Sequence, residues 1–155
     1  MECGRVLREA PPTSPSDETT ELRIVSVLFC DLVGHTPPSE RLDDDEVREL
    51  LSGYFDVARD VIARHGGTIE KFIGDAVMAV WGMPAAHEHD AERAVRAGLE
   101  LVDGVAAYGE RHHADGLAAR VGIVTGRAAT MASVDEGIVV GDRVNTAARI
   151  PGSIG

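Results

Sequence analysis

The chain has 155 residues, of which 44% are hydrophobic and 26% charged, and a formal net charge of −11 at pH 7. This length and composition fit one globular domain with a sizeable core. The acidic balance argues against a nucleic-acid partner or a membrane partner, because DNA and anionic bilayers are bound through clustered positive charge. If the ligand is an anion, the positive charge that holds it must be local or must come from metal ions.

Three further features point to a cytoplasmic protein. Its two cysteines, Cys3 and Cys30, are too few for a disulfide framework. No apolar run approaches the length needed to span a bilayer. The N-terminus lacks the apolar core of a secretory signal.

The N-terminal half predicts a leader, a strand and a helix. Residues 1–21 are rich in Pro, Ser, Thr and acid, and we expect a disordered leader ahead of one domain, 22–155. The apolar, β-branched run 23–34, "RIVSVLFCDLVG", predicts a central strand covered on both faces. Apolar residues recur at helical spacing through 42–67, with acids at the start and His65 and two glycines at the end.

The remaining elements alternate between strands and helices. Residues 68–82 predict a hairpin that turns at Gly74-Asp75. Residues 117–132 predict a strand, a turn and another strand, and 137–150 a short strand followed by a helix. Residues 87–112 predict a second helix, whose apolar stripe comprises Ala91, Ala94, Val95, Gly98, Leu101, Val102 and Val105. The predicted fold class is α+β, with a mostly antiparallel central sheet and helices packed on it.

Two carboxylates stand out because each lies in an otherwise apolar strand. Asp75 lies within "KFIGDAVMAVWG" and Asp31 within "VLFCDLVG". Such a charge is costly to bury unless it is paired or binds a metal. Gly-Asp is also a common turn pair, so a plain turn role for Asp75 is an alternative. Together, however, the two acids suggest that they meet and hold a hard cation such as Mg²⁺ beside a polyphosphate.

Four blocks, in this order and at this spacing, carry a family resemblance. They are "VLFCDLVGHT", "GGTIEKFIGDAVMAVWG", "RVGIVTGRA" and "VVGDRVNTAARI". The stretch from about Arg23 to Ile150 resembles the catalytic domain of class III nucleotidyl cyclases, the adenylate and guanylate cyclases. The resemblance implies a ferredoxin-like, palm-type domain that works as a dimer with its active sites at the interface.

The resemblance also implies roles for individual residues. Asp31, Asp75 and the backbone of Leu32 would bind two Mg²⁺ or Mn²⁺ ions per site. Asn145 and Arg149 would stabilise the transition state. The remaining implied contacts are to the nucleotide: Lys71 to the adenine base, Arg127 to phosphate, and otherwise Leu32, Val33, Gly34, His35, Thr36 and Gly74.

Each of these roles has a plainer alternative. Lys71 could be a solvated lysine at a strand edge, Asn145 a helix cap and Arg149 a surface ion-pair partner. Base selection would rest on Lys71 alone, because residues 138–140, which precede Gly141, are all apolar. Guanylate cyclases normally carry Glu in place of that lysine, so ATP is the expected substrate and GTP the less favoured one.

The resemblance leads to one main hypothesis and two competitors. The main one is an adenylate cyclase that is active as a homodimer. The family continues past "VNTAARI" with further strands, one of which carries a lysine for the triphosphate, whereas this chain ends at "PGSIG". The second hypothesis is therefore a weak or inactive cyclase-like module that binds nucleotide or a cyclase-like partner chain. The third hypothesis, a diguanylate-type cyclase, is discounted, because it would need a "GGDEF"-like turn where this chain has "IGDAV".

Overall fold

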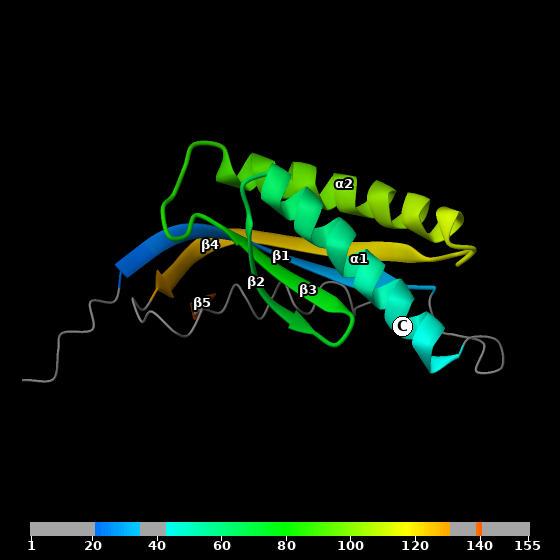
Figure 1. The fold of residues 1–155 in the computed structure, drawn as a ribbon. Coiled ribbons are helices and arrows are strands. Elements are labelled where there is room, and N and C mark those ends of the chain that lie inside the picture. The colour runs from blue at the N-terminus through cyan, green and yellow to red at the C-terminus, as the bar shows by residue number, and fades with distance from the viewer. Residues whose placement is uncertain (1–20, 35–42, 131–138, 141–155) are drawn as a thin grey trace, which may run out of the picture.

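The computed structural model describes residues 21–34, 43–130 and 139–140. Their order is β1 (Glu21–Val33), α1 (Asp44–Arg64), β2 (Thr68–Ile73), β3 (Ala76–Trp81), α2 (Asp90–Arg111), β4 (Ala118–Thr130) and β5 (Val139–Val140). The strands form one sheet in the order β2-β3-β1-β4-β5, and each neighbouring pair is antiparallel. Both helices lie across the same face of this sheet (Figure 1). The predicted α+β class is confirmed.

The central strand β1 is buried on both faces, as its continuous apolar run predicts. Leu28, Cys30 and Leu32 pack in the cluster beneath the helices, because alternate residues of a strand share a face. Val25, Val27 and Phe29, which alternate with residues of the first cluster, belong to a second buried cluster on the opposite face. By the same alternation, Asp31 points to the face that the helices do not cover.

Helix α1 has the predicted ends. Asp43 caps its first turn in a capping box with Glu46, so the side chains of both residues accept hydrogen bonds from backbone N–H groups. The helix ends at Arg64 with His65 as the C-cap, and Gly66 follows at a φ of 72°. Its buried face consists of Tyr54, Ala58, Val61 and Ile62.

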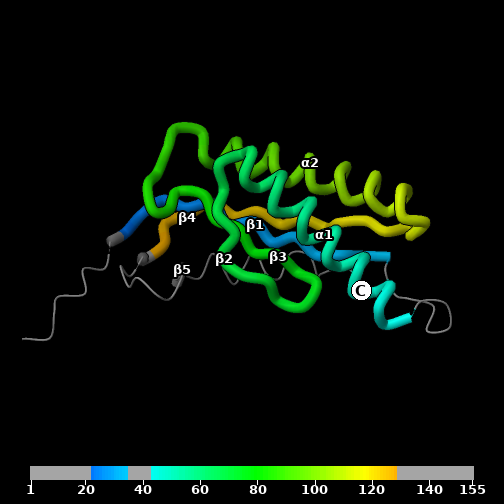
Figure 2. The backbone as a smooth tube through the Cα atoms, viewed as in Figure 1, coloured from blue at the N-terminus to red at the C-terminus, as the bar shows by residue number. Residues whose placement is uncertain are grey.

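The predicted hairpin is also present. β2 and β3 pair up to Ile73 and Ala76, which leaves Gly74 and Asp75 as a two-residue turn. Gly74 has a φ of 62°, a conformation that glycine adopts without steric cost. This turn lies at the same end of the sheet as the C-terminal end of β1 (Figure 2).

The prediction of a turn inside 117–132 is wrong. β4 is one strand of 13 residues that pairs with β1 from Ala118 to Thr130 without a register shift. Gly126 lies within this ladder opposite Val25. Next to it the Thr125 and Ser26 hydroxyls are 2.7 Å apart, within hydrogen-bond distance. The long partner strand therefore overrides the local turn tendency of Thr-Gly.

The apolar stripe predicted for α2 is correct only in part. Ala94, Gly98, Leu101 and Val105 are buried, together with Ala97 and Tyr108, which the prediction left out. Val95 and Val102, however, are 48% and 39% exposed, and Ala91 is also exposed. The helix instead turns its small residues to the sheet: a Cβ at Gly98 would lie 3.0 Å from side-chain carbons of Val121 and Ile123.

Candidate active site

Asp31 lies near the C-terminal end of β1 and forms an ion pair with Arg120 on β4. The Asp31 carboxylate and the Arg120 guanidinium are 3.1 Å apart, and the two residues are direct partners in the β1–β4 register. Their side chains are 28% and 43% exposed. Both project from the sheet face opposite the helices. The positive charge of Arg120 therefore balances that of Asp31 at a position that solvent can reach.

The structure brings Asp75 to the same end of the sheet as Asp31. Cys30 on β1 pairs with Val77 on β3, so Asp31 lies beside Ala76, the residue that follows Asp75. Asp75 itself is half-buried in the hairpin turn. The expectation that the two acids meet thus agrees with the strand register.

A buried tyrosine lies close to both acids on the helix side of the sheet. Burial, the Cys30 thiol and the charges of Asp75 and Asp31 all raise the pKa of Tyr54 well above its usual range. Its hydroxyl is 3.3 Å from the carbonyl oxygen of Cys30, to which it donates a hydrogen bond. Burial also raises the pKa of the Cys30 thiol to about 11. Both groups are therefore uncharged at neutral pH.

Lys71 is exposed on the same sheet face as Asp31. It pairs with Met78, whose side chain belongs to the cluster opposite the helices. Two strand spacings and two residues along the strand separate it from Asp31, a Cα distance of about 12 Å. Within one chain, Lys71 is near the two acids but not in their immediate surroundings.

Arg127 is not brought to the acids. It pairs with Ile24 and lies seven positions further along β4 than Arg120. At about 3.3 Å per residue, this is a separation of roughly 23 Å from Arg120. Any contact between Arg127 and a phosphate held at Asp31 would therefore have to come from another chain.

The segment after Asp31 is described as far as Gly34. Leu32 is buried, and Gly34 turns the chain at a φ of 75°. A Cβ on Gly34 would lie 2.0 Å from the carbonyl oxygen of Gly116, so the turn after β1 contacts the loop before β4 closely. Four of the predicted site residues lie outside the described residues: His35, Thr36, Asn145 and Arg149.

The donors at this end of the sheet suit a hard divalent cation. Asp31 and Asp75 supply carboxylate oxygens, and the backbone of Leu32 supplies a carbonyl, which are ligand types that Mg²⁺ and Mn²⁺ prefer. The described ranges contain no group of three or more His, Cys, Asp or Glu residues that is arranged to hold a metal ion. Two carboxylates are nevertheless typical for Mg²⁺ beside a nucleotide, because phosphate and water complete its shell. The residues therefore fit such a cation.

Sequence reasoning missed Arg120 and Tyr54. Arg120 had a visible signal, since it is a lone charge in an apolar strand, as Asp31 is. Its pairing with Asp31 depends on strand register across 89 residues of chain. Tyr54 gave no separate signal, because a tyrosine in the apolar stripe of a helix usually indicates core packing.

Comparisons with known proteins match most of the chain to one family. The family model described as "Adenylate and Guanylate cyclase catalytic domain" matches residues 18–153. The chain belongs to this family. Cyclase domains are also its structural neighbours, which confirms the palm-type fold that the sequence blocks implied.

The relatives of this cyclase-family chain include proteins named as adenylate cyclases and proteins named as guanylyl cyclases. Adenylate cyclase 1 of Rhizobium meliloti is 38% identical over 136 residues, which are 83% of this chain and 20% of that protein. The crystal structure of the guanylyl cyclase Cya2 is 34% identical, with a TM-score of 0.74, over 86% of this chain and 71% of that one. The adenylyl cyclase CyaB from P. aeruginosa is 30% identical, with a TM-score of 0.76, over 86% and 73%.

The chain spans only about a fifth of the length of Adenylate cyclase 1, and 12% and 23% of the next two curated relatives. In the part of the chain that the structure describes, no helix has the length and apolar character to cross a bilayer.

Proposed function

We propose that this cyclase domain converts ATP into 3′,5′-cyclic AMP and pyrophosphate at the interface of a homodimer. The observation that carries the proposal is the placement of Asp31 and Asp75 at one end of the sheet, with Arg120 beside Asp31. Family membership supports a nucleotide cyclase. The adenylate cyclase relative supports ATP as the substrate.

Asp31, Asp75 and the Leu32 carbonyl would hold two Mg²⁺ or Mn²⁺ ions. Bound there, the ions supply the positive charge that lowers the pKa of the ribose 3′-hydroxyl and balances the charge on the phosphates. Arg120 already lies beside Asp31 and presents a planar guanidinium, which suits a phosphate. With a cation at Asp31, Arg120 would be available to contact a phosphate of the nucleotide.

The remaining roles follow from the family blocks. Asn145 and Arg149 would stabilise the charge that develops on the α-phosphate. They lie four residues apart, so one helix face can carry both. Lys71 would donate a hydrogen bond to the adenine base. Backbone N–H groups of the segment from Leu32 to Thr36 would hold the phosphates, and Arg127 would reach a phosphate only from the partner chain.

We infer that the site is shared between two chains, because Lys71 lies about 12 Å from Asp31 within one chain and not in its immediate surroundings. In a symmetric dimer, the acids of one chain would face the Lys71, Asn145 and Arg149 of the other. Two equivalent sites would result.

A cyclic-nucleotide assay of the chain with Asp31→Asn and Asp75→Asn tests the proposal. Each variant should lose at least 100-fold in turnover, because neutral amides bind hard cations weakly. Asp45→Asn is the matched control, since Asp45 is an exposed acid on α1 paired with Arg48. Formation of cyclic GMP but not cyclic AMP by the wild type would overturn the choice of ATP. Nucleotide binding without turnover would identify an inactive module.

A further inference from the structure

One turn of α1 contacts both chain segments that carry the acids. Tyr54 has no exposed surface, and its hydroxyl contacts the carbonyl oxygen of Cys30 at 3.3 Å and its Sγ at 3.5 Å. Cys30 is the residue directly before Asp31. The hydroxyl therefore fixes the backbone from which the Asp31 side chain projects.

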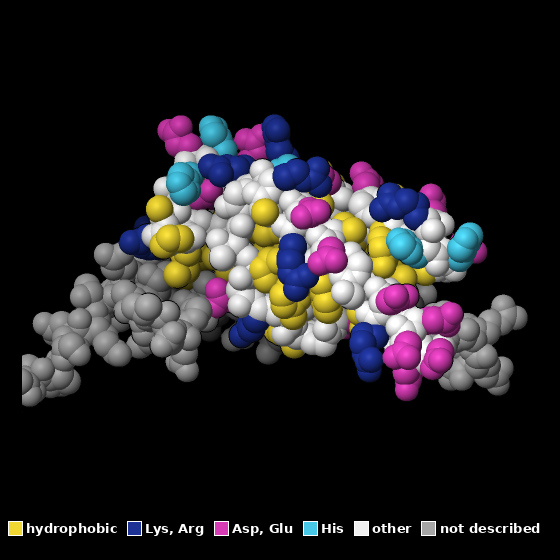
Figure 3. Space-filling model, viewed as in Figure 1, with side chains coloured by type: hydrophobic (Ala, Val, Ile, Leu, Met, Phe, Trp, Pro, Cys, Tyr) yellow, Lys and Arg dark blue, Asp and Glu magenta, His cyan; other side chains and the backbone are white. Residues whose placement is uncertain are grey.

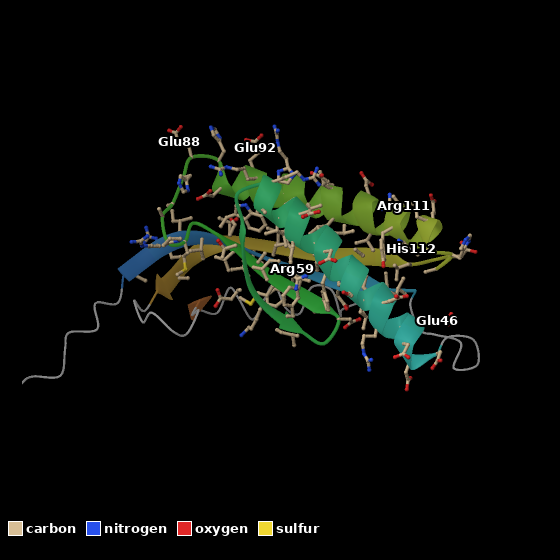
Figure 4. The ribbon with its side chains drawn as sticks, in the orientation of Figure 1. Glu46, Arg59, Glu88, Glu92, Arg111 and His112 are labelled. Carbon is tan, nitrogen blue, oxygen red and sulfur yellow. The ribbon has the colours of Figure 1, made fainter. Side chains whose placement is uncertain are left out.

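The next residue of α1 contacts the hairpin. The Phe55 ring packs edge-on against Phe72 of β2, with 4.7 Å between the ring centroids. Arg59, one helical turn further along, places its guanidinium 5.0 Å from the centre of the Phe72 ring. Arg59 extends from α1 where the helix lies across the hairpin (Figure 4). Phe72 lies two residues before the turn that contains Asp75.

These two contacts tie the segments together through a single rigid element. Tyr54 and Phe55 are also in mutual contact, with 5.1 Å between their ring centroids. The path from Cys30 to Phe72 thus runs through two adjacent aromatic side chains on one helix. We propose that Tyr54 and Phe55 are positioning residues, which set the spacing between the Asp31 and Asp75 carboxylates for divalent-cation binding. This inference rests on the proposed function.

The chemistry of Tyr54 suits this task. Its phenol hydroxyl is a neutral donor, and it donates its hydrogen bond to the Cys30 carbonyl oxygen. The neutral Tyr54 hydroxyl, on the helix side of the sheet, also adds no charge that would compete with the cation. Removal of a group that does not touch the metal but holds its ligands in place typically lowers metal affinity by about 10- to 100-fold. For one neutral hydrogen bond we expect the lower end of that range.

The test measures Mn²⁺ binding to the whole chain by calorimetry and electron paramagnetic resonance, without nucleotide. Tyr54→Phe removes only the hydroxyl and should weaken Mn²⁺ binding about tenfold. Tyr108→Phe is the matched control: Tyr108 is also buried and donates a hydrogen bond to the backbone of Leu50, yet it does not contact the Cys30 segment. This control should bind Mn²⁺ as the wild type does.

Phe55→Leu provides a second test that does not depend on the hydroxyl. It keeps an apolar side chain on α1 but loses the ring contact with Phe72, and should weaken Mn²⁺ binding about threefold. Circular dichroism establishes that each variant is folded before its affinity is compared. If folded Tyr54→Phe and Phe55→Leu bind Mn²⁺ as tightly as the wild type, the positioning role is wrong.

Failure of the inference and failure of the proposed function give different results. If Asp75→Asn abolishes Mn²⁺ binding while Tyr54→Phe and Phe55→Leu leave it unchanged, only the positioning role is overturned. If the wild type shows no Mn²⁺ binding that depends on Asp75, the cation site fails and the positioning role fails with it. Turnover assays add a second criterion: a positioning defect should lessen as the Mn²⁺ concentration rises.

Discussion

At the scale of single residues, the Asp31 carboxylate of the candidate site is balanced by Arg120 in an ion pair that is only partly buried. The Asp31 side chain is 28% exposed and that of Arg120 43%, so water screens their ion pair. Such a pair contributes little to the free energy of unfolding, and a cation or a phosphate can replace either partner at low cost. A fully buried pair would be far harder to open.

Lys71 is the residue on which the choice of base can be tested. Lys71→Glu should reduce turnover of ATP more than turnover of GTP, because glutamate can accept hydrogen bonds from guanine but cannot donate to adenine. A loss of one hydrogen bond to the base corresponds to about a tenfold decrease in kcat/KM. The measurement is kcat/KM for both nucleotides with Mg²⁺ and with Mn²⁺.

The exposed position of Lys71 makes this comparison clean, since the substitution should leave the folded state intact. Equal losses for ATP and GTP would show that Lys71 serves the phosphates or the structure instead of the base.

At the scale of elements, the two helices pack closely because α1 carries a glycine where α2 presents a tyrosine. A Cβ at Gly53 would lie 2.0 Å from the Tyr108 hydroxyl, which donates to the backbone of Leu50. A second contact joins the C-terminal end of α1 to the middle of α2, where the Glu100 carboxylate forms an ion pair with Arg64 and a hydrogen bond with His65, both at 2.6 Å. The hydrogen bond from His65 and the charge of Arg64 lower the pKa of Glu100, although burial opposes them.

Gly53→Ala should therefore destabilise the protein by about 1 to 3 kcal/mol, the usual effect of overpacking. Gly104→Ala is the control, because its Cβ would meet Val57 at 3.4 Å, an ordinary contact. Because alanine inside a helix is up to about 1 kcal/mol more stable than glycine, Gly104→Ala should not lower the free energy of unfolding. Urea unfolding of both variants checks the prediction. A Gly53→Ala protein as stable as the wild type would mean that Tyr108 can move aside freely.

How far the sequence predicts this structure differs between elements. α1 was predictable because its cap, its apolar period and its terminal glycines all agree. The turn expected inside β4 was wrong, because the long β1 partner holds Thr125 and Gly126 in the ladder. The stripe of α2 was misassigned in part, because the hydrophobicity of Val95 and Val102 placed them in it, whereas the face that packs on the sheet is built largely from alanine and glycine.

The candidate site was predictable to a different degree from the fold. Asp31 and Asp75 were visible because carboxylates are rare in apolar strands. Arg120 was not identified, since only the strand register shows that it faces Asp31. The remaining residues came from family blocks, and the blocks carry no information on distances within one chain. Arg127 illustrates this, because its place on β4 is far from the acids.

At the scale of the whole molecule, charge is distributed unevenly over the helices. The first turn of α1 contains Asp44, Asp45 and Glu46, and Figure 3 shows acidic side chains gathered at this end of the molecule. Lysine and arginine side chains are spread more widely over the visible face (Figure 3). For a domain with a net charge of −11 to hold a nucleoside triphosphate, local cations must supply the attraction.

Mixing two inactive variants tests whether the site is shared between chains. Asp75→Ala and Arg149→Ala should each be inactive alone. A mixed dimer has one site with both lesions and one with neither, so activity should return to roughly a quarter of wild type when half the dimers are mixed. The measurement is cyclic nucleotide formed by each variant and by the mixture.

Exchange between the chains must be verified separately, for example with two affinity tags. A mixture that exchanges fully and yet stays inactive would rule out the shared site, provided that the wild type is active.

The pairing of β2 with β3 has a register shift between Ile69 and Lys71, which affects how relatives of different length should be aligned. Ile69 pairs with Ala79 and Lys71 with Met78, so β2 has one residue more than its partner here. Loss of Glu70 would leave both pairs in step and every later side chain on its present face. Loss of Phe72 would instead send Lys71 to the helix side of the sheet. A one-residue gap in an alignment of this hairpin therefore belongs at position 70.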